Sequence, residues 1–216
     1  MKIFDLHLHT SFYSSCSIID PEELVRKAAE LNLDGLALTE HGLRWPDDKF
    51  DRLRRVADPW GLILLRGQEI STYSSINGPE GEFLVFGIKR SLTADLSAQE
   101  LVKRVHGEGG ILIAAHPFKL SRLGRKKYYG AGERIYELEL DALELYHPDH
   151  DEEALLKVQQ AMAKLGLPGT GSSDAHQIHE VGLCVTIFER PIFSEADLVR
   201  EIRAGRIQAK DNRKVG

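Results

Sequence analysis

Short apolar runs alternate with helix-like segments along almost the whole chain of 216 residues. Runs such as 62–66 and 111–115 are almost continuously apolar, which is typical of strands buried on both faces in a parallel sheet that helices cover. The segment 21–31 has Asp20 as a capping residue and an apolar stripe, as an amphipathic helix does. The alternation predicts an α/β fold, and we expect residues 1–216 to form one domain.

The first strand, 2–9, differs from these runs because its apolar and polar residues alternate with a period of two. Asp5, His7 and His9 therefore point to one face of the strand. Two imidazoles and a carboxylate on one face pack poorly in a core, but they are good metal ligands. The first strand thus predicts a metal site that other parts of the chain must complete.

Further candidate ligands lie at or just after the carboxyl ends of the predicted strands: His41, Glu69, His116, His147, Asp174 and His176. In a parallel α/β barrel those ends converge on one face. A single histidine at a strand end is more often a hydrogen-bonded residue than a ligand, but Asp174 and His176 repeat the same-face pairing of His7 and His9. These donors suit Zn, Mn or Fe, and they outnumber the ligands of one tetrahedral ion. We therefore expect two or three divalent ions.

Composition narrows the class of protein. The net charge of −5, with Lys+Arg 28 against Asp+Glu 33, argues against a protein that coats nucleic acid, although it allows a short oligonucleotide as substrate. Two cysteines are too few for a disulfide framework and indicate a reducing compartment. The chain enters its first strand without a signal peptide, and no apolar run reaches the ~20 residues that span a bilayer. We expect a soluble cytoplasmic protein with no membrane contact and no obligate protein partner.

Five short motifs occur in order along the chain: Asp5-x-His7-x-His9-Thr10, Thr39-Glu40-His41, Gly67-x-Glu69, Ala115-His116-Pro117 and Ser173-Asp174-Ala175-His176. Together they resemble the PHP (polymerase and histidinol phosphatase) domain, and the resemblance extends from the first strand to about Gly205. It implies a distorted (β/α)7 barrel of parallel strands. It also implies a phosphoesterase site that holds two or three metal ions.

The resemblance further assigns ligands to each ion. It implies that four residues hold the first ion: His7, His9, Glu69 and Asp174. Glu69 is expected to bridge to a second ion, which His116 and a residue of the fourth strand complete. A third ion is expected between His41 and His176.

The chain departs from the family pattern in two places. Residues 14–16, Ser-Ser-Cys, stand where an aspartate usually serves the third ion, and Glu82 stands where the fourth strand usually offers a histidine. Serine is the poorer replacement, so the third ion is expected to be weak or absent. Glu82 is either a ligand of the second ion or a solvated residue at a strand start. Of the other carboxylates, Asp5 is expected to hold an imidazole in place, and Glu40 either does the same or is solvated.

The expected activity is hydrolysis of a small phosphate mono- or diester, such as a nucleotide, a short oligonucleotide or histidinol phosphate, by water that the ions activate. His147 is expected to bind phosphate, to act as acid toward the leaving group or to bind metal. Three basic residues in the loop after His116 either contact the substrate or are solvated: Arg122, Arg125 and Lys126. Two other functions compete with this one. The first is amidohydrolase-like cleavage of C–N or C–O bonds, for which the chain lacks a suitably placed lysine, and the second is a metal-bound module without catalytic activity.

Overall fold

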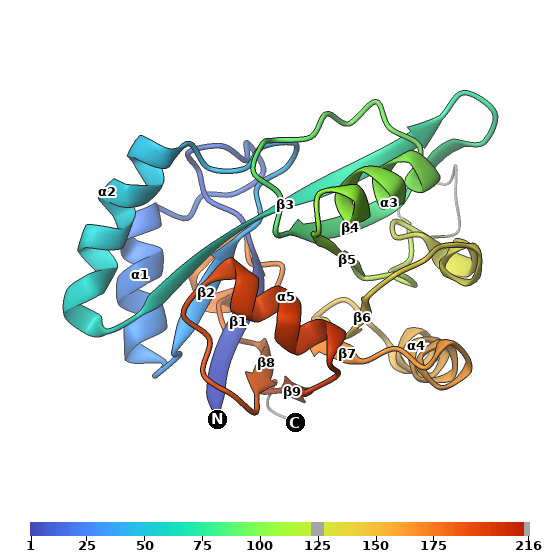
Figure 1. Cartoon of the computed structure of the whole chain (residues 1–216). Helices are drawn as coiled ribbons and strands as arrows, with labels where there is room; N and C mark the ends of the chain where they lie inside the picture. The colour runs from blue at the N-terminus through green and yellow to red at the C-terminus, as the bar shows by residue number, and fades with distance from the viewer. Residues whose placement is uncertain (122–127, 214–216) are drawn as a thin grey trace.

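The computed structural model describes residues 1–121 and 128–213 (Figure 1). Within these residues, nine strands form one sheet in the order β7-β6-β5-β4-β3-β2-β1-β8-β9. The strands are β1 (Lys2–Leu8), β2 (Gly35–Leu38), β3 (Ile63–Ser74), β4 (Gly78–Phe86), β5 (Ile111–Ala114), β6 (Ala142–Tyr146), β7 (Gly169–Gly171), β8 (Cys184–Phe188) and β9 (Ile207–Asp211). The α-helices are α1 (Pro21–Glu30), α2 (Asp47–Ala57), α3 (Ala98–Gly107), α4 (Glu152–Leu165) and α5 (Glu195–Arg203). Short 3₁₀ helices cover Asp58–Trp60, Gly132–Glu137 and Ile178–Glu180.

The sheet is mixed rather than wholly parallel. β1, β2 and β3 pair in parallel, as do β5, β6 and β7. β4 is antiparallel to β3 and β5, and β8 and β9 add two antiparallel strands beside β1. The prediction of a barrel-like α/β fold is confirmed, but the seven parallel strands expected become nine strands of both directions among the described residues. β3 and β4 run antiparallel because only residues 75–77 separate them, whereas a parallel connection needs about a dozen residues or more.

β3 is longer than the sequence indicated, and it carries Glu69 in its interior. In the sequence the apolar run ends at residue 66, and the mostly polar residues 71–81 are typical of a turn. Instead β3 pairs with β2 up to Arg66 and then with β4 from Gly67 to Ser74. Backbone hydrogen bonds to β4 therefore keep the polar second half of β3 extended. Glu69 still lies beyond the end of β2, beside the other strand ends.

The sheet curls until its first strand meets the segment after β7. Leu8 bridges Ala175 in parallel, and the backbone N–H of His9 donates to the Ala175 carbonyl at 3.2 Å. Nearby, a Cβ atom on Gly171 would lie 2.5 Å from the backbone oxygen of Val185, so only glycine allows β7 and β8 to approach this closely. This closure places the motif of the first strand next to Asp174 and its neighbours.

Helices cover the outside of the curled sheet, and α1 and α2 lie side by side (Figure 1). α1 begins as the sequence predicted, because the Asp20 side chain accepts hydrogen bonds from the backbone N–H groups of Glu22 and Glu23. The core is formed by apolar residues of the strands and of the buried helix faces. These packed elements hold the strand ends of the sheet in place.

No helix among residues 1–121 and 128–213 is both long and apolar enough to cross a membrane.

Candidate metal centre

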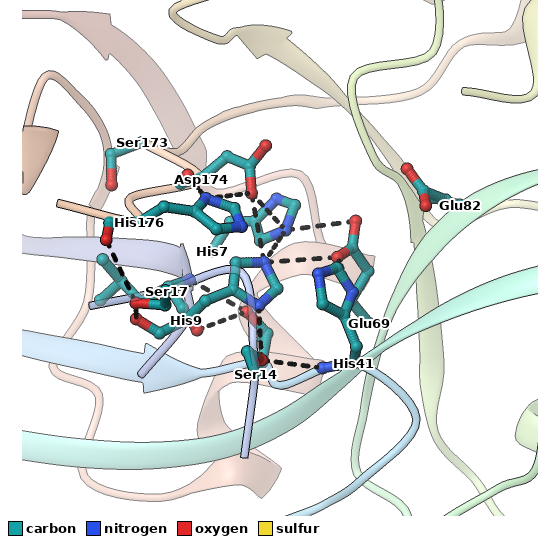
Figure 2. Close-up of polar contacts among 12 residues, drawn as sticks. His7, His9, Ser14, Ser17, His41, Glu69, Glu82, Ser173, Asp174 and His176 are labelled. Carbon is teal, nitrogen blue, oxygen red and sulfur yellow. Dashed lines mark hydrogen bonds and ion pairs between the residues drawn. The ribbon is translucent and has the colours of Figure 1, made fainter. Parts of the chain in front are cut away.

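Four side chains from three parts of the chain meet at the strand ends, three of them buried and that of Asp174 partly buried (Figure 2). His7 and His9 come from β1 and its end, Glu69 comes from β3, and Asp174 follows β7. The Nε2 atoms of His7 and His9 lie 3.1 Å apart. Each lies 3.2–3.3 Å from an oxygen of Glu69 and from Oδ1 of Asp174. The structure thus brings together the four residues expected around the first ion, which we call the first cluster.

The hydrogen bonds of the two imidazoles show that this cluster suits a cation. His7 Nδ1 lies 3.0 Å from Oε1 of Glu144, and His9 Nδ1 lies 3.2 Å from Oγ of Ser14. A neutral His7 therefore carries its proton on Nδ1, because a carboxylate only accepts. With the His9 proton on Nδ1 as well, two Nε2 lone pairs face each other. Two lone pairs repel unless a cation lies between them. A tetrahedral ion with bonds of ~2.1 Å separates its ligand atoms by about 3.4 Å, close to the spacing found here.

Without an ion, the first cluster holds protons instead. Burial opposes ionisation of Glu69 and Asp174, but the adjacent imidazoles hold the pKa of both carboxyl groups well below their ordinary values. Burial likewise works against the charged imidazoles, yet the neighbouring carboxylates raise the pKa of His7, and they raise the pKa of His9 to about 9. A metal ion that binds here must displace such protons.

A second cluster shares Glu69 and adds His116 and Glu82. His116 Nε2 lies 3.3 Å from Glu69 Oε1 and 3.5 Å from Glu82 Oε2. Glu82 is paired with Ser71 across β3 and β4, and the Ser71 hydroxyl donates to Glu82 Oε1 at 2.8 Å. Burial and the nearby charge of Glu69 raise the pKa of Glu82. Its carboxylate therefore faces the cluster and is not a solvated residue at a strand start.

His41 and His176 stack on His9, with ring centroids 4.3 Å and 4.6 Å away. His41 Nδ1 lies 2.9 Å from Glu69 Oε2, and His176 Nδ1 lies 2.7 Å from the Asp174 carbonyl oxygen. Both rings are more exposed than the first cluster. Within the described residues this third group consists of imidazoles alone, so it offers a third ion a poorer set of ligands than the other two clusters offer theirs.

Two site residues have unusual backbone conformations. His116 has a φ of +28° and Asp174 a φ of +50°. Positive φ is uncommon for residues other than glycine and costs on the order of 1–3 kcal/mol where the fold imposes it. The fold accepts this strain at two residues whose side chains enter the clusters.

The carboxylate that holds His7 was not identified from the sequence. Glu144 lies within β6 and is fully buried. Its Oε1 contacts His7 Nδ1 at 3.0 Å, and its Oε2 accepts the backbone N–H of His116 at 2.7 Å. Burial alone would raise the pKa of Glu144, but the charge of His7 lowers it to about 2. A single carboxylate inside the apolar run 142–146 was the signal that could have revealed it.

Asp5 does not hold an imidazole, and this expectation was wrong. Its Oδ1 accepts the backbone N–H of Ser173 at 3.0 Å, and its Oδ2 accepts the backbone N–H of Gly182 at 2.9 Å. Because Ser173 precedes Asp174, Asp5 holds the loop that carries a candidate ligand. Burial raises the pKa of Asp5 to about 6 despite these hydrogen bonds.

Glu40 is buried, so it is not solvated, and it contacts no imidazole directly. Neither of the two roles expected for it, a direct partner of an imidazole or a solvated charge, is found. It accepts hydrogen bonds from Thr10, from Trp45 Nε1 at 2.9 Å and from the Ser14 hydroxyl at 2.5 Å. Ser14 in turn contacts His9. Glu40 is therefore connected to an imidazole through an intermediate hydroxyl.

His147 and Lys119 contact the second carboxylate oxygen of Asp174, Oδ2, whereas His7 and His9 contact Oδ1. His147 Nδ1 accepts the backbone N–H of Asp149 at 3.0 Å, and its Nε2 lies 3.2 Å from Asp174 Oδ2. A neutral His147 ring therefore carries its proton on Nε2, where it is a donor. Its ring also lies with those of His7 and His116 in a group of three imidazoles that could hold a metal ion. Burial lowers the pKa of His147.

Lys119 was not identified from the sequence, although it follows His116 by three residues. Its Nζ lies 3.3 Å from Asp174 Oδ2 and 2.8 Å from Asp149 Oδ2. Burial works against the charge of the ammonium group, but the two carboxylates raise the pKa of Lys119. The three basic residues expected to contact the substrate, Arg122, Arg125 and Lys126, lie outside the described residues.

Comparison with known proteins adds to this geometry. Residues 5–114 match the family model of the PHP domain, and residues 152–207 match the PHP-associated model. Uncharacterized protein MJ1587 of Methanocaldococcus jannaschii is 26% identical over 156 residues, which cover 68% of this chain and 82% of that protein.

Two solved structures have a similar fold. One, from Bifidobacterium adolescentis and provisionally named a metal-dependent phosphoesterase, has a TM-score of 0.67 and 20% identity over 95% of this chain and 96% of its own. The other, an amidohydrolase from Chromobacterium violaceum with bound sulfate and no metal, has a TM-score of 0.64 and 17% identity over 95% of this chain and 97% of its own. At such identities the likeness concerns the fold.

Proposed function

The chain belongs to the PHP domain family, and on that premise we propose that it is a metal-dependent phosphoesterase that hydrolyses a small phosphate mono- or diester. Membership of the family supports a metal-dependent hydrolase. The observation that carries the proposal further is the pair of clusters that share Glu69, with the cationic Lys119 beside them. Since strands from Lys2 to Asp211 form one sheet, we treat residues 1–216 as one functional domain.

We assign two ions to the two clusters. The first ion would be held by four residues: His7, His9, Glu69 and Asp174. The second would be held by three: Glu69, Glu82 and His116. Their imidazole and carboxylate donors suit Zn, Mn or Fe. Such ions, when bound, activate a water for attack on phosphorus and offset the charge that develops on the phosphoryl oxygens.

Lys119 and His147 supply what a phosphate ester needs beyond the ions. The Lys119 ammonium contacts Oδ2 of Asp174, whereas His9 contacts Oδ1, and the ammonium can bind a phosphate oxygen. His147 holds its Nε2 proton next to the same carboxylate, so it can donate a hydrogen bond or a proton to a leaving oxygen. Because Asp149 fixes His147 Nδ1 as an acceptor, the role of donor is favoured over that of metal ligand.

An amidohydrolase-like reaction on carbon is the second candidate, since one similar structure is an amidohydrolase. A bridging carbamylated lysine would have to occupy the position between the clusters, and Glu69 already occupies it. A phosphate anion also complements Lys119 and the His147 donor better than a neutral amide does. These two features favour the phosphate ester.

The experiment is a substrate screen of the purified protein with Mn²⁺, with Zn²⁺ and with a chelator. The substrates are p-nitrophenyl phosphate, bis-p-nitrophenyl phosphate, nucleotides, short oligonucleotides and histidinol phosphate, with a p-nitrophenyl ester and an amide for the competing reaction. Turnover of a phosphate ester that requires metal supports the proposal. Turnover of the carbon substrates alone supports the amidohydrolase, and bound metal without turnover on any of these supports a non-catalytic module.

A matched pair of variants tests whether the activity belongs to this site. His7→Ala removes a ligand of the first ion and should lower the metal content and abolish turnover. His179→Ala changes an exposed histidine outside the clusters and should leave the metal content and turnover unchanged. Full activity in His7→Ala would contradict the site assignment.

A further inference from the structure

Three buried groups form a hydrogen-bonded chain behind the first cluster. Ser14 Oγ lies 2.5 Å from Glu40 Oε2 and 3.2 Å from His9 Nδ1. Ser14 is 2% exposed, and Glu40 and His9 are completely buried. Figure 2 shows Ser14 on the side of the His9 ring that faces away from Asp174. The hydroxyl therefore contacts the one nitrogen of this imidazole that is not directed into the cluster.

The Glu40 carboxylate, at one end of this row of hydrogen-bonded groups, can only accept hydrogen bonds. The indole N–H of Trp45 and the backbone N–H of Thr10 have no lone pair to offer, and both donate to Glu40, at 2.9 Å and 3.0 Å. The Thr10 hydroxyl is a further donor to Oε1 at 2.5 Å. Since these donors surround a carboxylate that is an acceptor, the Ser14 hydroxyl directs its single proton to Oε2.

The lone pairs of Ser14 are then available for other donors. The backbone N–H of His41 points at Ser14 Oγ at 3.4 Å, which agrees with an oxygen that accepts on this side. The remaining lone pair meets Nδ1 of His9. If the proton of a neutral His9 were on Nε2, the Nδ1 lone pair would face the Ser14 lone pair and the two would repel. The Ser14 lone pair therefore favours the proton on Nδ1, and Nε2 then has a free lone pair.

We propose that Ser14 is a positioning residue that keeps the His9 proton on Nδ1 and so keeps Nε2 available to the first ion. The proposal rests on the metal binding assigned above, but not on a phosphate ester as substrate. It also gives a physical reason for the hydroxyl at residue 14, within the segment 14–16 where the resemblance leads one to expect an aspartate. A carboxylate there would face Glu40, whereas a hydroxyl can both donate to Glu40 and accept from His9.

The first test compares the Zn²⁺ affinity of three proteins. Metal-free wild type, Ser14→Ala and Ser15→Ala are titrated with Zn²⁺ against a chromophoric chelator, and thermal melting confirms that each is folded. Losing the partner of a ligating imidazole weakens metal binding by about 10–100-fold, so Ser14→Ala should lose at least about tenfold. Ser15→Ala, which changes the exposed neighbour, should match wild type.

A second variant reverses the hydrogen bonds without removing the hydroxyl. In Glu40→Gln the donors Trp45 and Thr10 favour the amide oxygen at the Oε1 position, so the amide NH₂ faces Ser14. The Ser14 hydroxyl must then donate to His9, which places the imidazole proton on Nε2 and blocks that atom as a ligand. The Zn²⁺ affinity should fall at least as far as in Ser14→Ala, although the side chain keeps its shape.

A spectroscopic readout separates positioning from a merely structural role. In Zn²⁺-loaded wild type, the Nδ1–H of His9 should give an NMR signal protected from solvent exchange, and Ser14→Ala should lose that protection. Ser14→Thr keeps the hydroxyl and should restore both the protected Nδ1–H signal and the Zn²⁺ affinity. If Ser14→Ala does not fold, the Zn²⁺ affinity of Ser14→Thr tests the proposal instead. Affinity within twofold of wild type in folded Ser14→Ala, or a tenfold loss in folded Ser14→Thr, would overturn the proposal. A wild type that binds no Zn²⁺ would overturn this proposal and the assigned metal site together.

Discussion

Replacing Glu144 with glutamine tests how the buried framework prepares the metal centre. The carboxylate accepts one hydrogen bond from the His7 ring and another from the backbone N–H of His116. A glutamine at this position keeps the shape, but it can accept only one of them through its oxygen, and its NH₂ group then faces the other donor. Glu144→Gln therefore removes a charge and leaves a buried donor without an acceptor.

Two estimates give the loss of folding stability expected for Glu144→Gln. Burial raises the pKa of Glu144 but the charge of His7 lowers it, from the ordinary 4.5 to about 2, and a shift of this size corresponds to about 3 kcal/mol. A hydrogen bond to a charged group contributes ~1.5–3 kcal/mol, which agrees. Because the folded-state pKa is lowered, this stabilisation is complete above the unfolded pKa near 4.5 and is lost as the pH falls through about 2.

The assay is urea unfolding of the metal-free protein at pH 7. Glu144→Gln should lower the free energy of unfolding by about 3 kcal/mol and weaken Zn²⁺ binding by at least about tenfold, since its His7 ligand loses its partner. Glu139→Gln, at an exposed position, should stay within about 0.5 kcal/mol of wild type. A loss below about 0.5 kcal/mol for Glu144→Gln would refute the view that this carboxylate is an ionised partner of His7.

Three further predictions concern the site itself. Burial opposes protonation of His9, but neighbouring carboxylates raise its pKa to about 9, so a metal ion must displace this proton. Calorimetry in buffers of different ionisation enthalpy should show proton release on metal binding, and the metal affinity should rise about tenfold per pH unit from pH 6 to 8. Metal binding without proton release would contradict this prediction. Lys119→Ala should raise the KM for a phosphate ester about tenfold or more through loss of a charged contact, without changing the metal content, whereas Lys49→Ala at an exposed position should change neither. Glu82→Gln should reduce the ions per chain from two to one by elemental analysis, and two retained ions would remove Glu82 from the ligands.

The sequence was informative where chemistry and strand period coincide. His7 and His9 alternate along β1, and His116 and Asp174 follow β5 and β7, so a sheet that brings strand ends together places them in one site. These placements follow from the strand pattern even though the predicted strand directions were partly wrong.

The missed features depend on contacts that no local pattern specifies. Residues 71–74 are polar and resemble a turn, yet hydrogen bonds to β4 make them part of β3. Glu144 is a lone carboxylate in an apolar strand, and its partner His7 is 137 residues away in the sequence. Asp5 shares a strand face with two imidazoles, but the closure of the sheet brings the backbone of Ser173 to it instead. Tertiary packing determined each of these outcomes.

The most direct test of a two-ion phosphoesterase site is anomalous diffraction from crystals grown with Mn²⁺ and phosphate. We predict two Mn²⁺ peaks about 3.5–4 Å apart, one on each side of the Glu69 carboxylate, with phosphate in contact with both ions and with Lys119. The absence of a peak at the four residues of the first cluster, or two ions that do not share Glu69, would contradict the account.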